Sequence, residues 1–201
     1  MPKVGMEKIR KQQLIEATLT SIEQNGLHGT TISSISKLAG VSTGIISHYF
    51  GGKPELLQST FLYLLDQLKI DFLAQFDNGK PDARQRIDYI INANFSLSQI
   101  SNKAAIAWLS FWVQSMHDEN WQRLQKINNR RLAANLRFAF RQLLKPEYVE
   151  QAATMLASQI DGQWLRCALD HGNEQQFESA AMQCRELAAS LVSQFGKETL
   201  V

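Results

Sequence analysis

Apolar residues recur at helical spacing along nearly the whole of this chain. One face of the segment from 54 to about 76, for example, carries Leu57, Phe61, Leu64, Leu65, Leu68 and Phe72. Residues three and four apart share one face of an α-helix, whereas a strand alternates every second residue. No stretch shows convincing strand alternation, and only four prolines and eleven glycines interrupt the 201 residues. The sequence therefore predicts an all-α fold.

Turn-forming and polar residues divide this pattern into nine expected helices, three short ones followed by six that are mostly long. The first stops at Asn25-Gly26, and the second and third lie on either side of a turn at Gly40-Val41. The expected ranges after the first helix are 32–39, 43–50, 54–76, 82–99, 103–117, 119–144, 147–171 and 174–195. We expect a small head over residues 1–52 and a larger helical domain over 53–201.

Composition indicates a globular protein that is not a membrane protein. Hydrophobic residues make up 44% of the chain and charged residues 20%. The apolar run at 105–113 is about half of the roughly 18 residues that a membrane span needs. The basic N-terminus is followed by no apolar signal core, so a cytoplasmic location is expected. Cys167 and Cys184 lack metal-ligand spacing and are expected to be buried free thiols.

The segment Ala39-Gly40-Val41-Ser42 joins two short helices with the spacing of a helix-turn-helix. Ser42 is expected to cap the second helix, and Ile46 and Phe50 are expected to bury one of its faces. The residues left facing outward are Thr43, Gly44, Ser47 and His48, with Ile45 and Tyr49 at the margins. This outward surface is small and uncharged, which suits the major groove of DNA.

Two kinds of DNA contact are expected. Contacts with base edges are expected from Thr43, Gly44, Ile45 and Ser47. Hydroxyls can donate to or accept from bases, and glycine permits close approach of the backbone. Phosphate contacts are expected from His48, Tyr49 and Lys53. A lysine at a helix N-terminus opposes the helix dipole unless an anion lies there. Thr30 and Thr31 can either cap their own helix or contact a second phosphate. The net charge of +2 is too small to indicate nucleic-acid binding by itself.

The segment TTISSISKLAGVSTGIISHYFGGKPELL, residues 30–57, resembles the DNA-binding signature of the tetracycline-repressor (TetR) family. The resemblance implies a DNA-binding helix-turn-helix domain over 1–52 and a ligand-binding and dimerisation domain over 53–201. It also implies a repressor that binds a palindromic double-stranded operator. Two positions depart from the family pattern: Ser36 stands where alanine is usual, and Ser47 where tyrosine is common.

A branch of that family, the choline-responsive repressors of glycine betaine synthesis, gives a closer resemblance. It rests on MPKVGMEKIRKQQLIEATL at the start, STGIISHYF, AWLSFWVQSMH and IDGQWLR. The resemblance implies repression of genes for choline uptake and for synthesis of betaine, an osmoprotectant. Choline or a related quaternary ammonium would modulate operator binding. The alternative is a TetR-type repressor of an efflux or other operon that responds to a different hydrophobic cation.

Aromatic residues in the larger domain are candidates for binding such an effector. Trp108, Phe111 and Trp112 share one helical face, and Trp164 follows Asp161 by three residues. A quaternary ammonium has no hydrogen-bond donor on nitrogen and is bound through aromatic faces, with a carboxylate adding Coulomb attraction. Aromatic residues at helical spacing are equally typical of a core. Asp161 could also pair with Arg166 or cap a polar interior.

The last two expected helices carry apolar residues in alternating steps of four and three, which favours near-parallel packing of the pair. An intrachain hairpin would account for that seam. Further apolar residues lie off the seam: Met155, Leu165, Leu169, Met182 and Leu187. A homodimeric four-helix interface through these two helices is therefore expected.

An enzyme is the rival class of protein, but the chain lacks its motifs. We find no Glu-x-x-His pairs, no HExxH and no nucleophile elbow, and the four histidines are scattered. No catalytic residue, metal or cofactor is expected. A purely structural dimer would explain the C-terminal seam but not a second short helix shaped for a groove.

Overall fold

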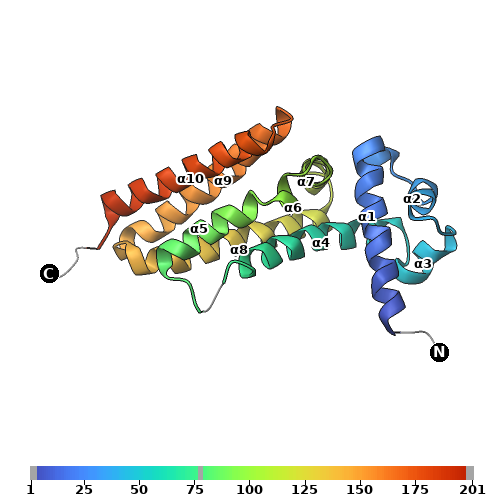
Figure 1. Cartoon of the computed structure of the whole chain (residues 1–201), viewed down its shortest axis with the longest axis horizontal. Coiled ribbons are helices and arrows are strands. Elements are labelled where there is room, and N and C mark those ends of the chain that lie inside the picture. The colour runs from blue at the N-terminus through green and yellow to red at the C-terminus, as the bar shows by residue number, and fades with distance from the viewer. Residues whose placement is uncertain (1–3, 77–78, 198–201) are drawn as a thin grey trace. The chain divides into compact units, whose positions relative to one another are not determined.

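The computed structural model describes residues 4–76 and 79–197, and it is all-helical over those ranges (Figure 1). The α-helices are α1 (Val4–Gly29), α2 (Ile32–Ala39), α3 (Gly44–Phe50), α4 (Lys53–Leu73), α5 (Ala83–Asn94), α6 (Leu97–Ile100), α7 (Asn102–Ser115), α8 (Glu119–Leu143), α9 (Val149–Leu169) and α10 (Glu174–Phe195), with a short 3-10 helix, η1 (Pro146–Tyr148), before α9. The part of the chain that the structure describes has no strand beyond an isolated bridge between Leu144 and Gly196. The predicted all-α fold is confirmed.

Each of the nine predicted helices is present in the described ranges, and one of them is divided. The helix predicted over 82–99 breaks at Phe95 and Ser96 into α5 and α6. The hydroxyls of Ser96 and Ser98 donate to the Asp71 carboxylate at 2.6 and 2.5 Å. A serine hydroxyl that bonds away from its own helix favours a turn over continued helix, which accounts for the break.

The first predicted break is at the expected place. Although α1 runs to Gly29 as a continuous element, Gly26 within it has φ 69° and ψ 172°. Glycine adopts a positive φ at little cost, whereas a side chain would be strained there. The helix therefore changes direction at the predicted Asn25-Gly26 stop.

Two compact units make up the described chain. The first contains everything up to Asp66 together with Ser101–Arg123, and the second contains Gln67–Ile100 together with everything from Leu124 onward. The predicted head lies within the first unit, except for residues 1–3, which lie outside the described residues. The first unit also takes in α7, which packs on α1. The functional boundary between residues 52 and 53 stays a prediction.

Within the second unit, α9 and α10 form an antiparallel hairpin (Figure 1). The turn between them is closed by a capping box in which Asn173 Oδ1 accepts the Gln176 N–H and Gln176 Oε1 accepts the Asn173 N–H. The predicted seam is buried between the two helices. Its fully or nearly fully buried members include Ala153, Leu156, Ile160, Phe177, Cys184 and Leu191. A hairpin within one chain therefore accounts for the burial of the seam residues.

Both cysteines are free thiols, as predicted. Cys184 is buried in the seam, and burial raises its pKa to about 11. Cys167 is only half-buried, so the prediction of full burial is wrong for that residue. It lies near the end of α9, where its Sγ is 3.7 Å from the Gln176 carbonyl oxygen. Among the described helices, none combines the length and apolar character that a membrane crossing requires.

The contact of Asp71 with the two serines gives a test of the fold. Asp71→Ala should lower the free energy of unfolding by about 2 kcal/mol, because two hydroxyls lose a charged acceptor. Asp66→Ala is the matched control, since Asp66 is exposed on the same helix. Urea denaturation at a fixed protein concentration measures both variants. Equal midpoints for the two would contradict a structural role for the Asp71 bonds.

Candidate functional site

The turn between α2 and α3 is fixed by backbone hydrogen bonds. Gly40 has φ 63° and ψ 37°, the left-handed conformation that glycine adopts most readily. The Val41 N–H donates to the Ser36 carbonyl oxygen at 3.0 Å, and the Gly40 N–H to that of Lys37 at 3.3 Å. This pattern satisfies carbonyl groups that the end of a helix otherwise leaves unpaired. The turn therefore ends α2 and defines where α3 begins.

The N-terminus of α2 assigns different roles to the two adjacent threonines. Thr31 is the N-cap: its Oγ1 accepts the Ser34 N–H at 3.0 Å, and Ser34 Oγ accepts the Thr31 N–H at 2.9 Å. Thr31 remains exposed. Thr30 is 0% exposed, and its hydroxyl donates to the Gly26 carbonyl oxygen. The Thr30 hydroxyl is therefore buried and already bonded in this structure, and its contact with a phosphate stays a prediction.

The two faces of α3 agree with the predicted division. Ile46 is 0% exposed and Phe50 is half-buried, so this face holds the helix in the head. The exposed residues on the other side are Ser42, Thr43, Gly44, Ser47 and His48, while Ile45 and Tyr49 are half-buried. The roles of these residues in DNA contact stay predictions.

The start of α3 differs from the prediction that Ser42 caps it through its side chain. The helix begins at Gly44, and its cap position is Thr43, which has helical angles of φ −59° and ψ −32° and makes no side-chain cap. The Ile45 N–H instead donates to the Ser42 carbonyl oxygen at 3.1 Å. A backbone turn therefore replaces the side-chain cap. Neither the Ser42 nor the Thr43 hydroxyl has a hydrogen bond within the described chain, so both remain available to a ligand.

The end of α3 brings together the three predicted phosphate contacts. The rings of His48 and Tyr49 meet edge to face, with centroids 4.8 Å apart. Gly51 then turns the chain with φ 92°, and Lys53 is the first residue of α4. The described residues place no carboxylate within ion-pair distance of Lys53. Its ammonium therefore lies at a helix N-terminus, where an anion is favoured, without an internal partner.

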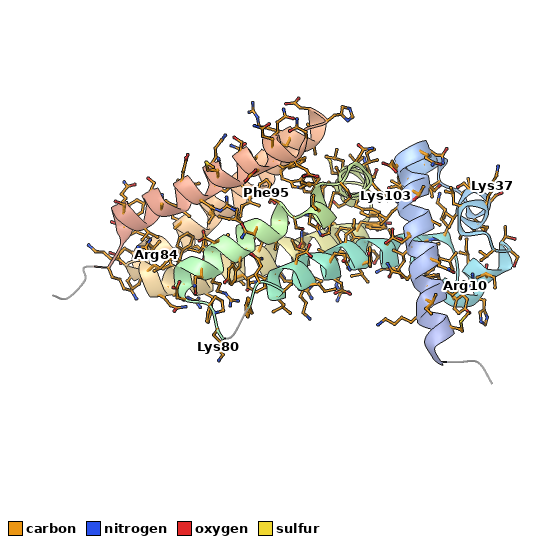
Figure 2. All side chains as sticks on the ribbon, in the orientation of Figure 1. Arg10, Lys37, Lys80, Arg84, Phe95 and Lys103 are labelled. Atoms are coloured by element: carbon orange, nitrogen blue, oxygen red, sulfur yellow. The ribbon has the colours of Figure 1, made fainter. Side chains whose placement is uncertain are left out.

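One basic residue near the turn was not predicted from the sequence as a DNA contact. Lys37 lies in the last turn of α2 and is exposed, while Arg10 on α1 donates to Gln13 (Figure 2). Lysine near a helix C-terminus has an ordinary role, since it complements the helix dipole. Lys37 lies three residues before the Gly40 turn, so it adds an exposed positive charge near the end of α2.

Two of the predicted effector contacts lie in a tightly packed aromatic cluster of the first unit. The ring of Phe61 lies 5.2 Å from the rings of both Trp108 and Phe111, and Trp121 stacks on Phe111 at 5.0 Å. Trp108 is 6% exposed and Phe111 1% exposed. Trp108 and Phe111 are therefore core residues in this structure. A ligand would reach them only if the aromatic cluster opened. Trp112 is half-buried.

The other two predicted effector contacts lie on α9 in the second unit. Trp164 is buried, with its ring 6.5 Å from that of Phe177. Asp161 is exposed as a residue, although the atoms around its carboxyl group exclude enough water to raise the pKa of that group to about 6. The structure shows no ion pair between Asp161 and Arg166. The effector roles of these residues stay predictions.

Comparisons with known proteins agree with this arrangement. Residues 14–60 match the family described as bacterial regulatory proteins, tetR family, and residues 83–193 match the BetI-type transcriptional repressor, C-terminal region. The HTH-type transcriptional regulator BetI of Vibrio parahaemolyticus is 51% identical over 85% of this chain and 86% of its own length.

Solved structures share the fold. A putative transcriptional regulator from Pseudomonas aeruginosa is 26% identical, with a TM-score of 0.76 and coverage of 92% of this chain and 91% of that chain. A putative transcriptional regulator from Saccharomonospora viridis, solved in complex with choline, is 17% identical with a TM-score of 0.73, and the match covers 94% of this chain and 98% of that one. At that identity the second likeness supports the fold alone.

Ser36 gives a test of the packing that holds the two short helices. Its side chain is 3% exposed, and Oγ makes no hydrogen bond with the described residues. Ser21 is also fully buried, but its Oγ lies 2.8 Å from that of Ser34. The free energy of unfolding of the Ser36→Ala variant should be about 1 kcal/mol higher than that of the Ser21→Ala variant, because only Ser21→Ala loses a hydrogen bond. Urea denaturation compares the two, and equal stabilities would mean that the Ser36 hydroxyl is satisfied in solution.

Proposed function

Because this chain belongs to the TetR family of bacterial regulators and has a BetI-type C-terminal region, we propose that it represses genes of choline uptake and glycine betaine synthesis. Choline or a related quaternary ammonium modulates its binding to operator DNA. The chain is a helix-turn-helix transcriptional regulator and not an enzyme, as the sequence predicted. The exposed face of α3 carries the DNA-binding part of the proposal, and the BetI-type C-terminal match supports the part that concerns choline.

In the proposed complex, α3 lies in the major groove. Its exposed face carries no Asp, Glu, Lys or Arg side chain and offers the hydroxyls of Thr43 and Ser47, with the backbone of Gly44 between them in the chain. A small surface of this kind lets the helix approach base edges closely, and its hydroxyls can donate or accept. The absence of internal bonds to Ser42 and Thr43 supports this use, since binding would break no existing contact.

Phosphate contacts fix the orientation of α3 in the groove. His48 and Tyr49 lie at its end, Lys53 begins the next helix, and Thr31 lies exposed at the start of α2. Contacts to phosphate set position and register without carrying sequence information.

A homodimer through α9 and α10 supplies the second head. Met155, Leu169 and Met182 are 42%, 61% and 53% exposed on this hairpin, although the seam between the helices is already buried. Leu165 and Leu187 are half-buried on the same two helices. A second hairpin would cover this apolar surface. Two heads could then reach successive major grooves of a palindromic operator, about 34 Å apart.

The effector acts by changing the spacing of the two heads. A ligand shifts an equilibrium only by binding one state more tightly than the other. The helix α4 is continuous from Lys53 to Leu73, so movement at its C-terminal half reaches the residue that begins it beside the DNA surface. A quaternary ammonium is recognised by aromatic faces, with a carboxylate adding Coulomb attraction. The candidate residues lie in both units: Trp108, Phe111 and Trp112 in the first, and Asp161 and Trp164 in the second.

The effector assignment is tested by gel-shift titration of an operator fragment selected from genomic DNA by binding. Saturating choline should weaken operator affinity by about tenfold, within the range usual for coupling between two sites. Ethanolamine, which lacks the methyl groups, is the matched control and should have little effect. Unchanged affinity with choline, betaine aldehyde and glycine betaine would reject the effector assignment but leave the DNA-binding role intact. Release by other hydrophobic cations instead would support the efflux alternative.

The phosphate role of Lys53 is tested by the salt dependence of binding. Lys53→Ala should weaken all DNA sequences about equally and reduce the salt slope by about one, because one fewer counterion is released. Lys69→Ala is the control, since Lys69 is exposed on the same helix but farther along it. Loss of discrimination between sequences with an unchanged slope would show that Lys53 reads bases.

A further inference from the structure

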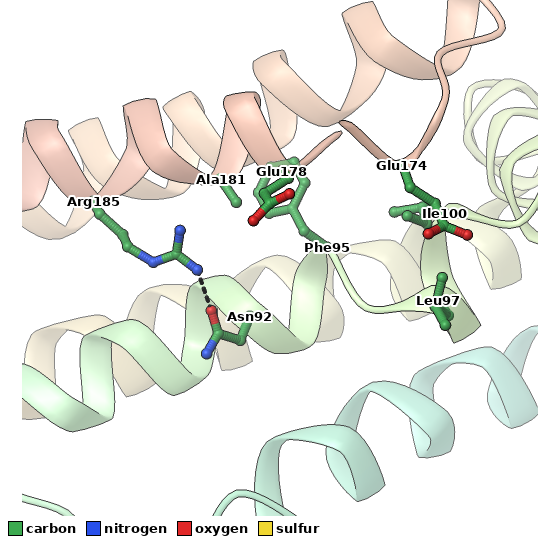
Figure 3. A pocket seen from close by; sticks show the side chains of 8 residues that line it. All are labelled: Asn92, Phe95, Leu97, Ile100, Glu174, Glu178, Ala181 and Arg185. Carbon is green, nitrogen blue, oxygen red and sulfur yellow. Dashed lines mark hydrogen bonds between the residues drawn. The ribbon is translucent and has the colours of Figure 1, made fainter. Parts of the chain in front are cut away.

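A cavity of about 240 Å³ lies in the second unit, between the α5–α6 junction and the first half of α10 (Figure 3). It is lined by Asn92, Phe95, Leu97, Ile100, Glu174, Glu178, Ala181 and Arg185. At about 30 Å³ per water, this volume corresponds to about eight waters, which is room for a small metabolite. None of the predicted effector residues lines it.

One side of the cavity is acidic. Glu174 and Glu178 are one helical turn apart on α10, and both are exposed. Neither carboxylate has an ion pair or hydrogen bond within the described chain. Glu174 has an ordinary structural role, since an acid in the first turn of a helix complements its dipole. Glu178 lies beyond that turn, and what distinguishes it from other exposed glutamates is that it lines the cavity.

The wall beside these carboxylates is apolar. Phe95 is 9% exposed, and its ring lies 6.5 Å from that of Phe177, which fixes it in the core. Leu97 is 66% exposed and Ile100 half-buried, so aliphatic surface is open to an occupant. An aromatic ring with nearby carboxylates recognises an organic cation, whereas a metal ion needs a fuller set of oxygen ligands.

The other end of the cavity is polar and positively charged. Arg185 donates a hydrogen bond to Asn92 Oδ1, and Figure 3 shows the pair at the opposite end from Glu174, Ile100 and Leu97. A guanidinium has five N–H donors, so others remain beyond that bond. They suit an oxygen of the occupant. A purely anionic ligand would be repelled by the two glutamates.

We propose that this cavity binds a small organic cation that carries an oxygen function at its far end. The ammonium lies between Glu178 and the ring of Phe95, and the oxygen faces Arg185. As the effector site of the regulator, the cavity takes the place of the candidate residues on α7 and α9, and this assignment rests on the function proposed above.

A ligand bound in the cavity can affect α4 within the same unit. Phe95 directly precedes Ser96, and the hydroxyls of Ser96 and Ser98 are bonded to Asp71 on α4. A ligand that draws α10 toward the α5–α6 junction therefore acts on the segment whose two serines are bonded to the C-terminal half of α4.

Calorimetric titration of the full-length protein tests the site. The probes are choline, its uncharged carbon isostere, and glycine betaine. Choline should bind at least tenfold more tightly than the isostere, because only choline gains Coulomb and cation–π attraction. Glu178→Gln should weaken choline binding about tenfold, since it removes one charge next to the ammonium. Glu186→Gln is the matched control, an exposed glutamate of the same helix that does not line the cavity, and it should bind like the unchanged protein.

The outcomes separate this proposal from the previous one. Choline binding that is equal in the unchanged protein and Glu178→Gln overturns the cavity assignment, even if choline still releases the operator. Binding that depends on Glu178 but leaves operator affinity unchanged supports the cavity and rejects its role as effector site. Absence of binding by choline and glycine betaine at tens of millimolar overturns the cavity assignment as well.

Discussion

The burial of Ile46 decides which face of α3 is left for DNA. Its side chain is 0% exposed, and the turn before it is fixed by the left-handed conformation of Gly40 and the bond from Val41 to Ser36. A seven-residue helix is too short to be stable by itself, so its position depends on that packing. Thr43, Gly44 and Ser47 are exposed because Ile46 is not. The proposed groove contacts therefore follow from one buried residue and one turn.

Much of this surface could be predicted because the signals are local. The positive φ of Gly26 and Gly40 and the burial of Ile46 follow from residue type and helical spacing. The prediction that the Ser42 side chain caps α3 is wrong, because the Ile45 N–H donates to the backbone carbonyl oxygen of Ser42 instead. The break between α5 and α6 was missed because the acceptor of Ser96 is Asp71, which lies 25 residues earlier in the chain. Pattern alone does not reveal a partner at that distance.

The same limit applies to the effector region. The spacing of Trp108 and Phe111 predicts a shared face correctly, but a shared face can pack against the core, as it does around Phe61. The cavity beside α10 joins residues 92–100 to residues 174–185, and no local pattern connects those segments. Its two glutamates look like ordinary solvated residues in the sequence. Only the fold shows that they lie beside Phe95 and opposite Arg185.

Chemical probing of the two grooves shows whether the exposed face of α3 lies in the major groove of an operator. Dimethyl sulfate methylates guanine N7 in the major groove and adenine N3 in the minor groove, and binding should protect only the former. With α3 of each head in the major groove, N7 protection is expected in two blocks about one helical turn apart, one for each head of a dimer. Protection confined to adenine N3, or no protection at a bound operator, would contradict it.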